Sequence, residues 1–224
     1  MVSYDLRRSR RKTVGIYIKD GRVEVRAPFR ATLREIEKFV ASKDAWINEK
    51  LLKSIDRLEA RGAFELNYGD SVICRGASYR IAAREGARAG FDGAEFYMPP
   101  GMPPWRIKSC CVQIYRMIAK RDLPGRVSRH ARAMGVSPAS VGVSGAKTRW
   151  GSCSSRKSLN FSWRLIIADD EVIDYVVVHE LAHLKEMNHS ERFWAIVEGA
   201  LPDCRARKAR LRALQKRLSL ENWD

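Results

Sequence analysis

The amino-acid sequence predicts an α+β protein in which a mixed or antiparallel sheet packs against a buried helix. Three observations lead to this fold class. Residues 13–27 alternate polar and apolar side chains around an Asp-Gly pair, which is typical of a β-hairpin. Thr32 and Glu35 have the spacing of a helix capping box. Residues 172–184 are apolar almost all round, as expected for a helix inside a core.

The first hundred residues are predicted to be β-rich with a helical insertion. Pro28 ends the second strand of the hairpin, and apolar residues at helical spacing then predict one or two amphipathic helices to about residue 60. Short β runs separated by glycines follow at residues 71–74, 79–82 and 95–98. We therefore expect an N-terminal part at residues 1–100 and a second domain at residues 101–224.

The second part is predicted to combine helices with three strands. Helical periodicity extends from Trp105 to about Lys120, and a second helix is expected to follow Pro124. Asp169 can cap the buried apolar helix, because a side-chain carboxylate accepts hydrogen bonds from the first free amides. The predicted strands are residues 140–144, 147–153 and 158–167, and residues 205–217 form a predicted basic amphipathic helix.

Composition excludes several classes of protein. Hydrophobic residues make up 45% and charged residues 30% of the 224 residues, which is typical of a globular protein. No stretch approaches the roughly 18 apolar residues of a membrane span, and the N-terminus lacks the apolar segment of a secretory signal. Five cysteines without a Cys-x2-Cys spacing favour a reducing compartment and argue against a zinc knuckle. We expect a cytoplasmic protein, and composition leaves its oligomeric state open.

The chain carries a formal net charge of +16, from 42 Lys and Arg against 26 Asp and Glu. Such a charge gives solubility and a loose attraction to any polyanion, or it marks a site for nucleic acid or for a phosphorylated substrate. The basic residues are spread over the chain, so charge alone does not choose between these interpretations. Any nucleic-acid binding from it is expected to be weak, salt-dependent and not sequence-specific.

The strongest chemical signal is the motif His-Glu-Leu-Ala-His in the buried helix. His179 and His183 are four residues apart, so both imidazoles leave the same helix face and can bind one Zn²⁺ at about 2.0–2.1 Å. Glu180 lies about 100° further round the helix, beside the metal rather than among its ligands. His189 can return after the helix ends as a third ligand, which leaves a fourth position for water, the arrangement of catalytic zinc. The alternative is that these are incidental core or surface histidines.

These residues predict a zinc-dependent hydrolase that uses a zinc-bound water, with Glu180 as its general base. Two arginines are candidates for binding a substrate carboxylate or phosphate, Arg149 and Arg164, although a salt bridge at a strand end explains them as well. Cys153 is either a reactive thiol near the metal or a buried small residue. An extended peptide could pair with residues 158–167 if they form an exposed edge strand.

Several segments resemble a known family. The segments are His179 to Trp194, Thr-Arg-Trp-Gly-Ser-Cys at 148–153, Asn-Phe-Ser-Trp-Arg-Leu at 160–165, and Val-Arg-Ala-Pro at 25–28. Together they resemble the YgjP-like zinc metallopeptidases over nearly the whole chain. The third histidine followed by Phe193 and Trp194 is more distantly similar to the SprT/Spartan and WLM proteases, some of which digest proteins crosslinked to DNA.

The resemblance implies a zincin-like C-terminal part with zinc ligands His179, His183 and His189 and catalytic Glu180. It favours a metallopeptidase acting on a peptide or protein. A pyrophosphatase activity on a nucleoside triphosphate such as UTP has also been attached to the family. The sequence therefore leaves two alternatives to a general peptidase: a nucleotide pyrophosphatase that uses the same metal site, and a SprT-like protease associated with DNA.

Overall fold

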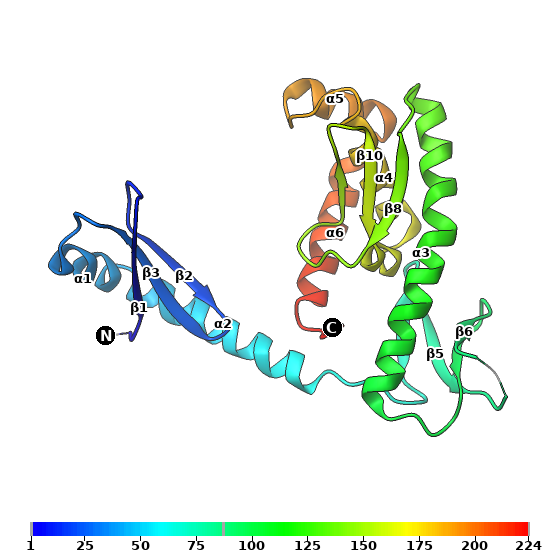
Figure 1. Cartoon of the computed structure of the whole chain (residues 1–224), viewed down its shortest axis with the longest axis horizontal. Helices are drawn as coiled ribbons and strands as arrows, with labels where there is room; N and C mark the ends of the chain where they lie inside the picture. The colour runs from blue at the N-terminus through cyan, green and yellow to red at the C-terminus, as the bar shows by residue number, and fades with distance from the viewer. Residues whose placement is uncertain (1, 87, 224) are drawn as a thin grey trace. The chain divides into compact units, whose positions relative to one another are not determined.

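The computed structural model describes residues 2–86 and 88–223. Within these residues six α-helices and three small sheets confirm the predicted α+β class (Figure 1). No helix in this described part is long and apolar enough to cross a membrane. The chain divides into two compact units, Met1–Phe64 with Arg217–Asn222, and Glu65–Lys216 with Trp223.

The first unit is a three-stranded sheet with two helices. Its strand order is β1-β3-β2, with β1 parallel and β2 antiparallel to β3, so the predicted hairpin is confirmed as β2–β3. The strand β1 was not predicted. The elements are β1 (Asp5–Ser9), β2 (Gly15–Lys19), β3 (Arg22–Pro28), α1 (Leu33–Ala41) and α2 (Asp44–Ala63).

Local signals explain the helices of this unit. The capping box is formed, because the Thr32 amide donates to Glu35 Oε2 at 2.8 Å and the Glu35 amide donates to Thr32 Oγ1 at 3.2 Å. Alternate residues of β3 point to the same face of the sheet, because side chains in a strand alternate with a period of two. Apolar residues from one face of each helix pack against them and form the core of this unit. The buried residues of this core are Val23, Val25, Ala27, Ile36, Val40 and Ile47.

The second unit begins with a four-stranded sheet of order β4-β5-β7-β6. Its strands are β4 (Ser71–Cys74), β5 (Ala77–Ala83), β6 (Gly90–Phe91) and β7 (Glu95–Met98). The Tyr115 hydroxyl donates to the Ile73 carbonyl oxygen at 2.7 Å, and the rings of Phe96 and Tyr115 lie 5.2 Å apart. These long-range contacts group residues 65–98 with the chain that follows, so the division at residue 64 differs from the expected one at residue 100.

A single helix, α3 (Pro104–Met134), replaces the two helices expected here. Pro124 lies inside it, so the prediction of a break at this proline was wrong. One buried stripe, which includes Leu123, Val127 and Ala131, continues past the proline, and burial of this stripe offsets the lost backbone hydrogen bond. Gly135 ends the helix with a positive φ of 63°.

The third sheet has the order β8-β10-β9, with β8 (Ser140–Ser144) parallel and β9 (Gly151–Cys153) antiparallel to β10 (Ser158–Ser162). The observed strand β9 is therefore shorter than the strand predicted over residues 147–153. The prediction over 158–167 is corrected too, because Trp163–Ile167 is a 3₁₀-helix. Since β10 is the central strand, it offers no free edge to a peptide, and β9 is an edge strand instead.

The apolar helix of the sequence motif is α4 (Asp170–Ala182), and it packs against α3 and β9 (Figure 1). Asp169 caps it as predicted, accepting from the Val172 amide at 2.9 Å. Two further helices follow, α5 (Glu191–Ala200) and α6 (Cys204–Leu218), and α6 confirms the predicted basic helix.

Ion pairs fix the first half of α4 to α3. The Arg126 side chain is only 10% exposed, and its guanidinium donates to Asp174 Oδ1 at 2.8 Å and to the Asp170 carboxylate. Asp174 also lies 3.3 Å from His130 Nε2 and accepts from Arg129 at 2.8 Å. The Arg126–Asp174 pair is largely shielded from solvent and therefore costly to break, so it holds the helix that carries the motif in one position.

Asp174 should make the stability of the fold depend on acid pH. Burial alone would raise the pKa of Asp174, but hydrogen bonds from His130 and Arg126 outweigh it and lower the pKa from 3.8 to about 2. The ionised carboxylate therefore stabilises the fold above about pH 4, and this contribution, about 2 kcal/mol, is lost as the pH falls through 2. Denaturant titrations between pH 5 and about 2 should show a shallower decline for Asp174→Asn than for wild type. The exposed Glu85→Gln is the control, and an unchanged slope in Asp174→Asn would contradict the expectation.

Candidate metal centre

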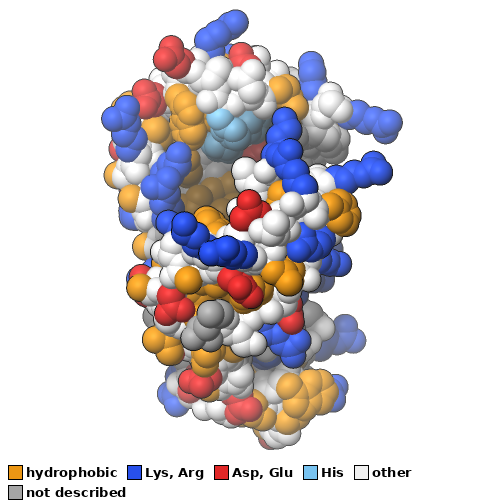
Figure 2. All heavy atoms as spheres, turned by 90° about the vertical axis from the view of Figure 1, so that its left-hand side faces the viewer, with side chains coloured by type: hydrophobic (Ala, Val, Ile, Leu, Met, Phe, Trp, Pro, Cys, Tyr) orange, Lys and Arg blue, Asp and Glu red, His pale blue; other side chains and the backbone are white. Residues whose placement is uncertain are grey.

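The three clustered histidines of the sequence lie around one point at the end of α4. His179 is in the last turn of the helix, His183 follows its last residue, and His189 is in the connection to α5. Their ligand atoms all lie within 4.8 Å of one another. Figure 2 shows histidine side chains as a pale-blue patch at the surface of the protein.

The ring nitrogens are arranged as a metal site requires. His179 Nε2 and His189 Nε2 lie 3.1 Å apart, close to the separation of about 3.3 Å between two ligands of tetrahedral zinc with bonds of about 2.0–2.1 Å. Two neutral imidazoles that face each other in this way need a proton or a cation between their lone pairs. His183 Nδ1 lies 3.2 Å from the Glu186 carbonyl oxygen, so the tautomer that donates to this carbonyl leaves Nε2 as the ligand atom.

The connection after α4 returns His189 to the helix through local capping. The Ser190 amide donates to Asn188 Oδ1 at 3.0 Å, and Ser190 then caps α5 by accepting from the Phe193 amide at 3.4 Å. A tight turn therefore separates the two helices. This turn explains how a histidine six residues beyond His183 can reach the same point.

Phe193 and Trp194 pack against the imidazoles. Phe193 is fully buried, and its ring centroid lies 4.6–4.9 Å from those of all three histidines. Trp194 stacks on His189 with centroids 6.0 Å apart, and Lys208 Nζ lies 4.2 Å from the Trp194 ring centroid. Through these contacts the two aromatic residues hold the His189 ring in place.

Burial favours the neutral form of two of these histidines, His179 and His183. It lowers the pKa of His179 to about 3, with further lowering by the neighbouring imidazoles and Lys208. Burial also lowers the pKa of His183, although the hydrogen bond to the Glu186 carbonyl opposes it. Neutral imidazole is the form that binds a metal, and three nitrogen ligands are a suitable set for zinc. The residues present therefore fit a zinc ion.

Glu180 lies beside the cluster but outside it. Its side chain is buried, with 6% exposure, and it is not one of the grouped ligand residues. Burial raises the pKa of Glu180 to about 7, while the nearby charge of Arg149 lowers it. A buried carboxyl with a raised pKa next to ligand residues is typical of a catalytic group.

The other sequence candidates differ in the groups that they interact with. Arg149 is exposed and is close enough to act on the charge of Glu180. Arg164 instead donates to the Gly145 carbonyl oxygen at 3.1 Å and lies over the Trp163 ring at 4.6 Å, so the fold uses it structurally. Cys153 is half-buried on β9, and burial together with Glu180 raises the pKa of its thiol, which disfavours a reactive thiolate.

Sequence reasoning missed two neighbours of the centre. Lys208 comes from α6, where it lies over the Trp194 ring and helps to lower the pKa of His179 through its charge. Gly151 lies against Glu180, and its one sequence signal was its position in the Thr-Arg-Trp-Gly-Ser-Cys segment.

Three imidazoles around one point, with a buried carboxyl group on the residue after His179, match the ligand set and base of metal-dependent hydrolases. The model of the YgjP-like family, a metallopeptidase domain, matches residues 12–214 of the chain. The chain therefore belongs to the YgjP-like metallopeptidase family.

Two solved structures are similar to part of the chain. They are the metallopeptidase zymogens abylysin of Pyrococcus abyssi and jannalysin of Methanocaldococcus jannaschii, each 22% identical. The similarity covers 44% and 42% of this chain and 96% of each of those chains, with TM-scores of 0.38 and 0.37. No curated protein matches the chain significantly.

Proposed function

We propose that this protein is a zinc-dependent metallopeptidase in which His179, His183 and His189 hold the metal and Glu180 is the general base. The observation that carries the proposal is the convergence of three ring nitrogens beside one buried carboxylate. Membership of a metallopeptidase family supports it.

The residues of the chain divide the chemistry between them. Bound zinc would polarise the scissile carbonyl and lower the pKa of a water molecule. Glu180 accepts a proton as water attacks the peptide carbonyl carbon, and the same proton then passes to the nitrogen of the leaving amine. The carbon–nitrogen bond breaks, and a carboxylic acid and an amine are the products.

The edge strand β9 is where we place an extended substrate. Its inner side pairs with β10 from Gly151 to Cys153, and no other strand of the described chain pairs with it. A peptide added along the free side of β9 gains main-chain hydrogen bonds and lies next to Glu180, which contacts Gly151. We assign Arg149, which precedes this strand, to contact a carboxylate of the substrate.

Purified protein should hydrolyse an unfolded protein in a metal-dependent way. The test measures hydrolysis by zinc-loaded protein and by protein stripped of metal with a chelator. The substrates are labelled unfolded casein, casein crosslinked to DNA, and UTP. Each substrate is tested at low and at physiological salt. We expect cleavage of free casein that is lost on stripping and restored by zinc. Cleavage confined to crosslinked casein would favour the DNA-associated protease, and hydrolysis of UTP alone would overturn the peptidase proposal. Metal content measured on the same samples shows whether a negative result reflects an empty site.

A further inference from the structure

Gly151 touches the Glu180 side chain at the point where β9 begins. A Cβ atom built on Gly151 would lie 2.6 Å from both Cγ and Oε1 of Glu180 and 2.8 Å from its Cδ. Such distances are far inside van der Waals contact. Among the described glycines, Gly151 is not one of those with a positive φ, so backbone conformation does not require glycine here. The requirement comes from the carboxylate that lies against it.

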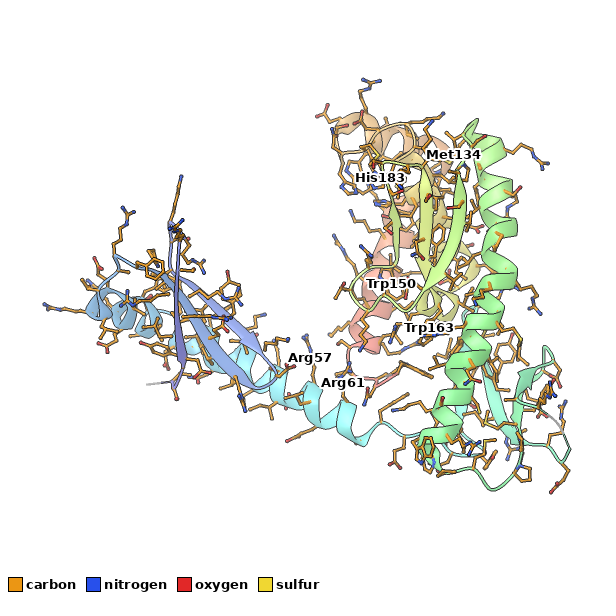
Figure 3. All side chains as sticks on the ribbon, in the orientation of Figure 1. Arg57, Arg61, Met134, Trp150, Trp163 and His183 are labelled. Carbon is orange, nitrogen blue, oxygen red and sulfur yellow. The ribbon has the colours of Figure 1, made fainter. Side chains whose placement is uncertain are left out.

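Neither backbone at this contact can easily move away. On one side, Gly151 is paired with Phe161 in the sheet, and the preceding Trp150 carbonyl oxygen accepts from the Ser162 amide at 2.8 Å. On the other side, α4 is packed by fully buried residues such as Val178 and Leu181. Figure 3 shows Trp150 in the loop that enters β9, and His183 beyond the end of α4. Only the Glu180 side chain is free to yield, so a methyl group at residue 151 would displace the carboxylate itself.

We propose that Gly151 is a positioning residue, whose bare Cα forms the wall that holds the Glu180 carboxylate beside the three histidines. The proposal rests on the function proposed above, since it assigns the purpose of the contact to that reaction. It also explains why a glycine stands at this point of an edge strand: a side chain would occupy the space of the general base.

The same sheet supplies a matched control. Gly142 lies in β8, and a Cβ atom built on it would meet Asn160 Oδ1 at 3.5 Å and other atoms at 3.7–3.8 Å, which are ordinary contacts. Gly142→Ala and Gly151→Ala therefore make the same chemical change in one sheet. They differ in whether the new methyl group meets Glu180.

The first test is kinetic. We expect Gly151→Ala to lower kcat about 10²-fold, the scale of a displacement of about 1 Å in a catalytic group, with KM within about twofold and zinc content unchanged. Gly142→Ala should retain wild-type rates. In a Glu180→Gln background, Gly151→Ala should cause no further loss, because its effect acts through that carboxylate. The proposal would be overturned if Gly151→Ala lowered kcat as much in the Glu180→Gln background as in the wild-type background. It would also be overturned if Gly151→Ala alone kept the wild-type kcat.

The second test measures stability and does not depend on any substrate. Overpacking by one methyl group should lower the thermal midpoint of Gly151→Ala by about 2–8 °C. The same substitution in a Glu180→Ala background should lower it by less than about 1 °C, because the colliding Cγ, Cδ and Oε1 atoms are then absent. A midpoint cost that is equal in both backgrounds would show that Glu180 is not the contact. This cycle remains informative if the wild type hydrolyses no peptide, so failure of the proposed function and failure of the contact give different results.

Discussion

Replacing Glu180 by glutamine is expected to reduce hydrolysis by about 10²-fold or more while zinc stays bound. Glutamine keeps the size and the helix compatibility of glutamate but cannot accept a proton at neutral pH. Because the Glu180 side chain lies outside the histidine cluster, its exchange should not remove a ligand. Rates measured together with zinc content and circular dichroism separate a chemical effect from a loss of metal or fold.

Glu186→Gln is the control for this substitution. Glu186 follows α4 and interacts with His183 through its backbone carbonyl, which the exchange leaves in place. Its activity should therefore stay near that of the wild type. If Glu180→Gln lost its zinc, Glu180 would support the site instead of acting as the base. If Glu180→Gln kept both metal and full activity, Glu186 would be the next residue to test as the base.

Removing His189, the third proposed ligand, is expected to reduce zinc occupancy sharply. His189→Ala leaves only His179 and His183, and two imidazoles do not complete the three-ligand set of a catalytic zinc site. The measurement is zinc per protein after equilibration against a chelating buffer of fixed free zinc, with wild type compared directly. Full occupancy in His189→Ala would remove His189 from the ligand set.

His130→Ala is the matched control for that experiment. His130 is the one histidine of the sequence outside the cluster, and it contacts Asp174 in the first half of α4. Its loss should leave zinc occupancy unchanged even if it lowers stability. A decrease in zinc in both variants would indicate partial unfolding instead of the loss of a ligand.

Features encoded by neighbouring residues could be predicted from the sequence. The hairpin β2–β3, the capping box of α1 and the cap of α4 by Asp169 each depend on residues within a few positions, and all three are present. The spacing of the motif histidines on one helix face is equally local, because the helix period alone brings His179 and His183 to one side.

Features that depend on partners distant in sequence could not be predicted in this way. The continuous helix α3 contains Pro124 because burial along one stripe outweighs the local cost of proline. The strand β10 became central because β8 and β9 both pair with it, which alternation within one strand does not reveal. The grouping of residues 65–98 with the second unit likewise depends on the contacts of Tyr115.

For the candidate site, the sequence by itself determined the chemical groups: three imidazoles and a carboxylate at spacings that suit one metal ion and one base. The tertiary structure alone decided their surroundings. It placed Phe193 against all three rings and brought Gly151 against Glu180. The physical reason is that a helix period orients side chains within a few residues, whereas the position of a carboxylate depends on which strand packs against it.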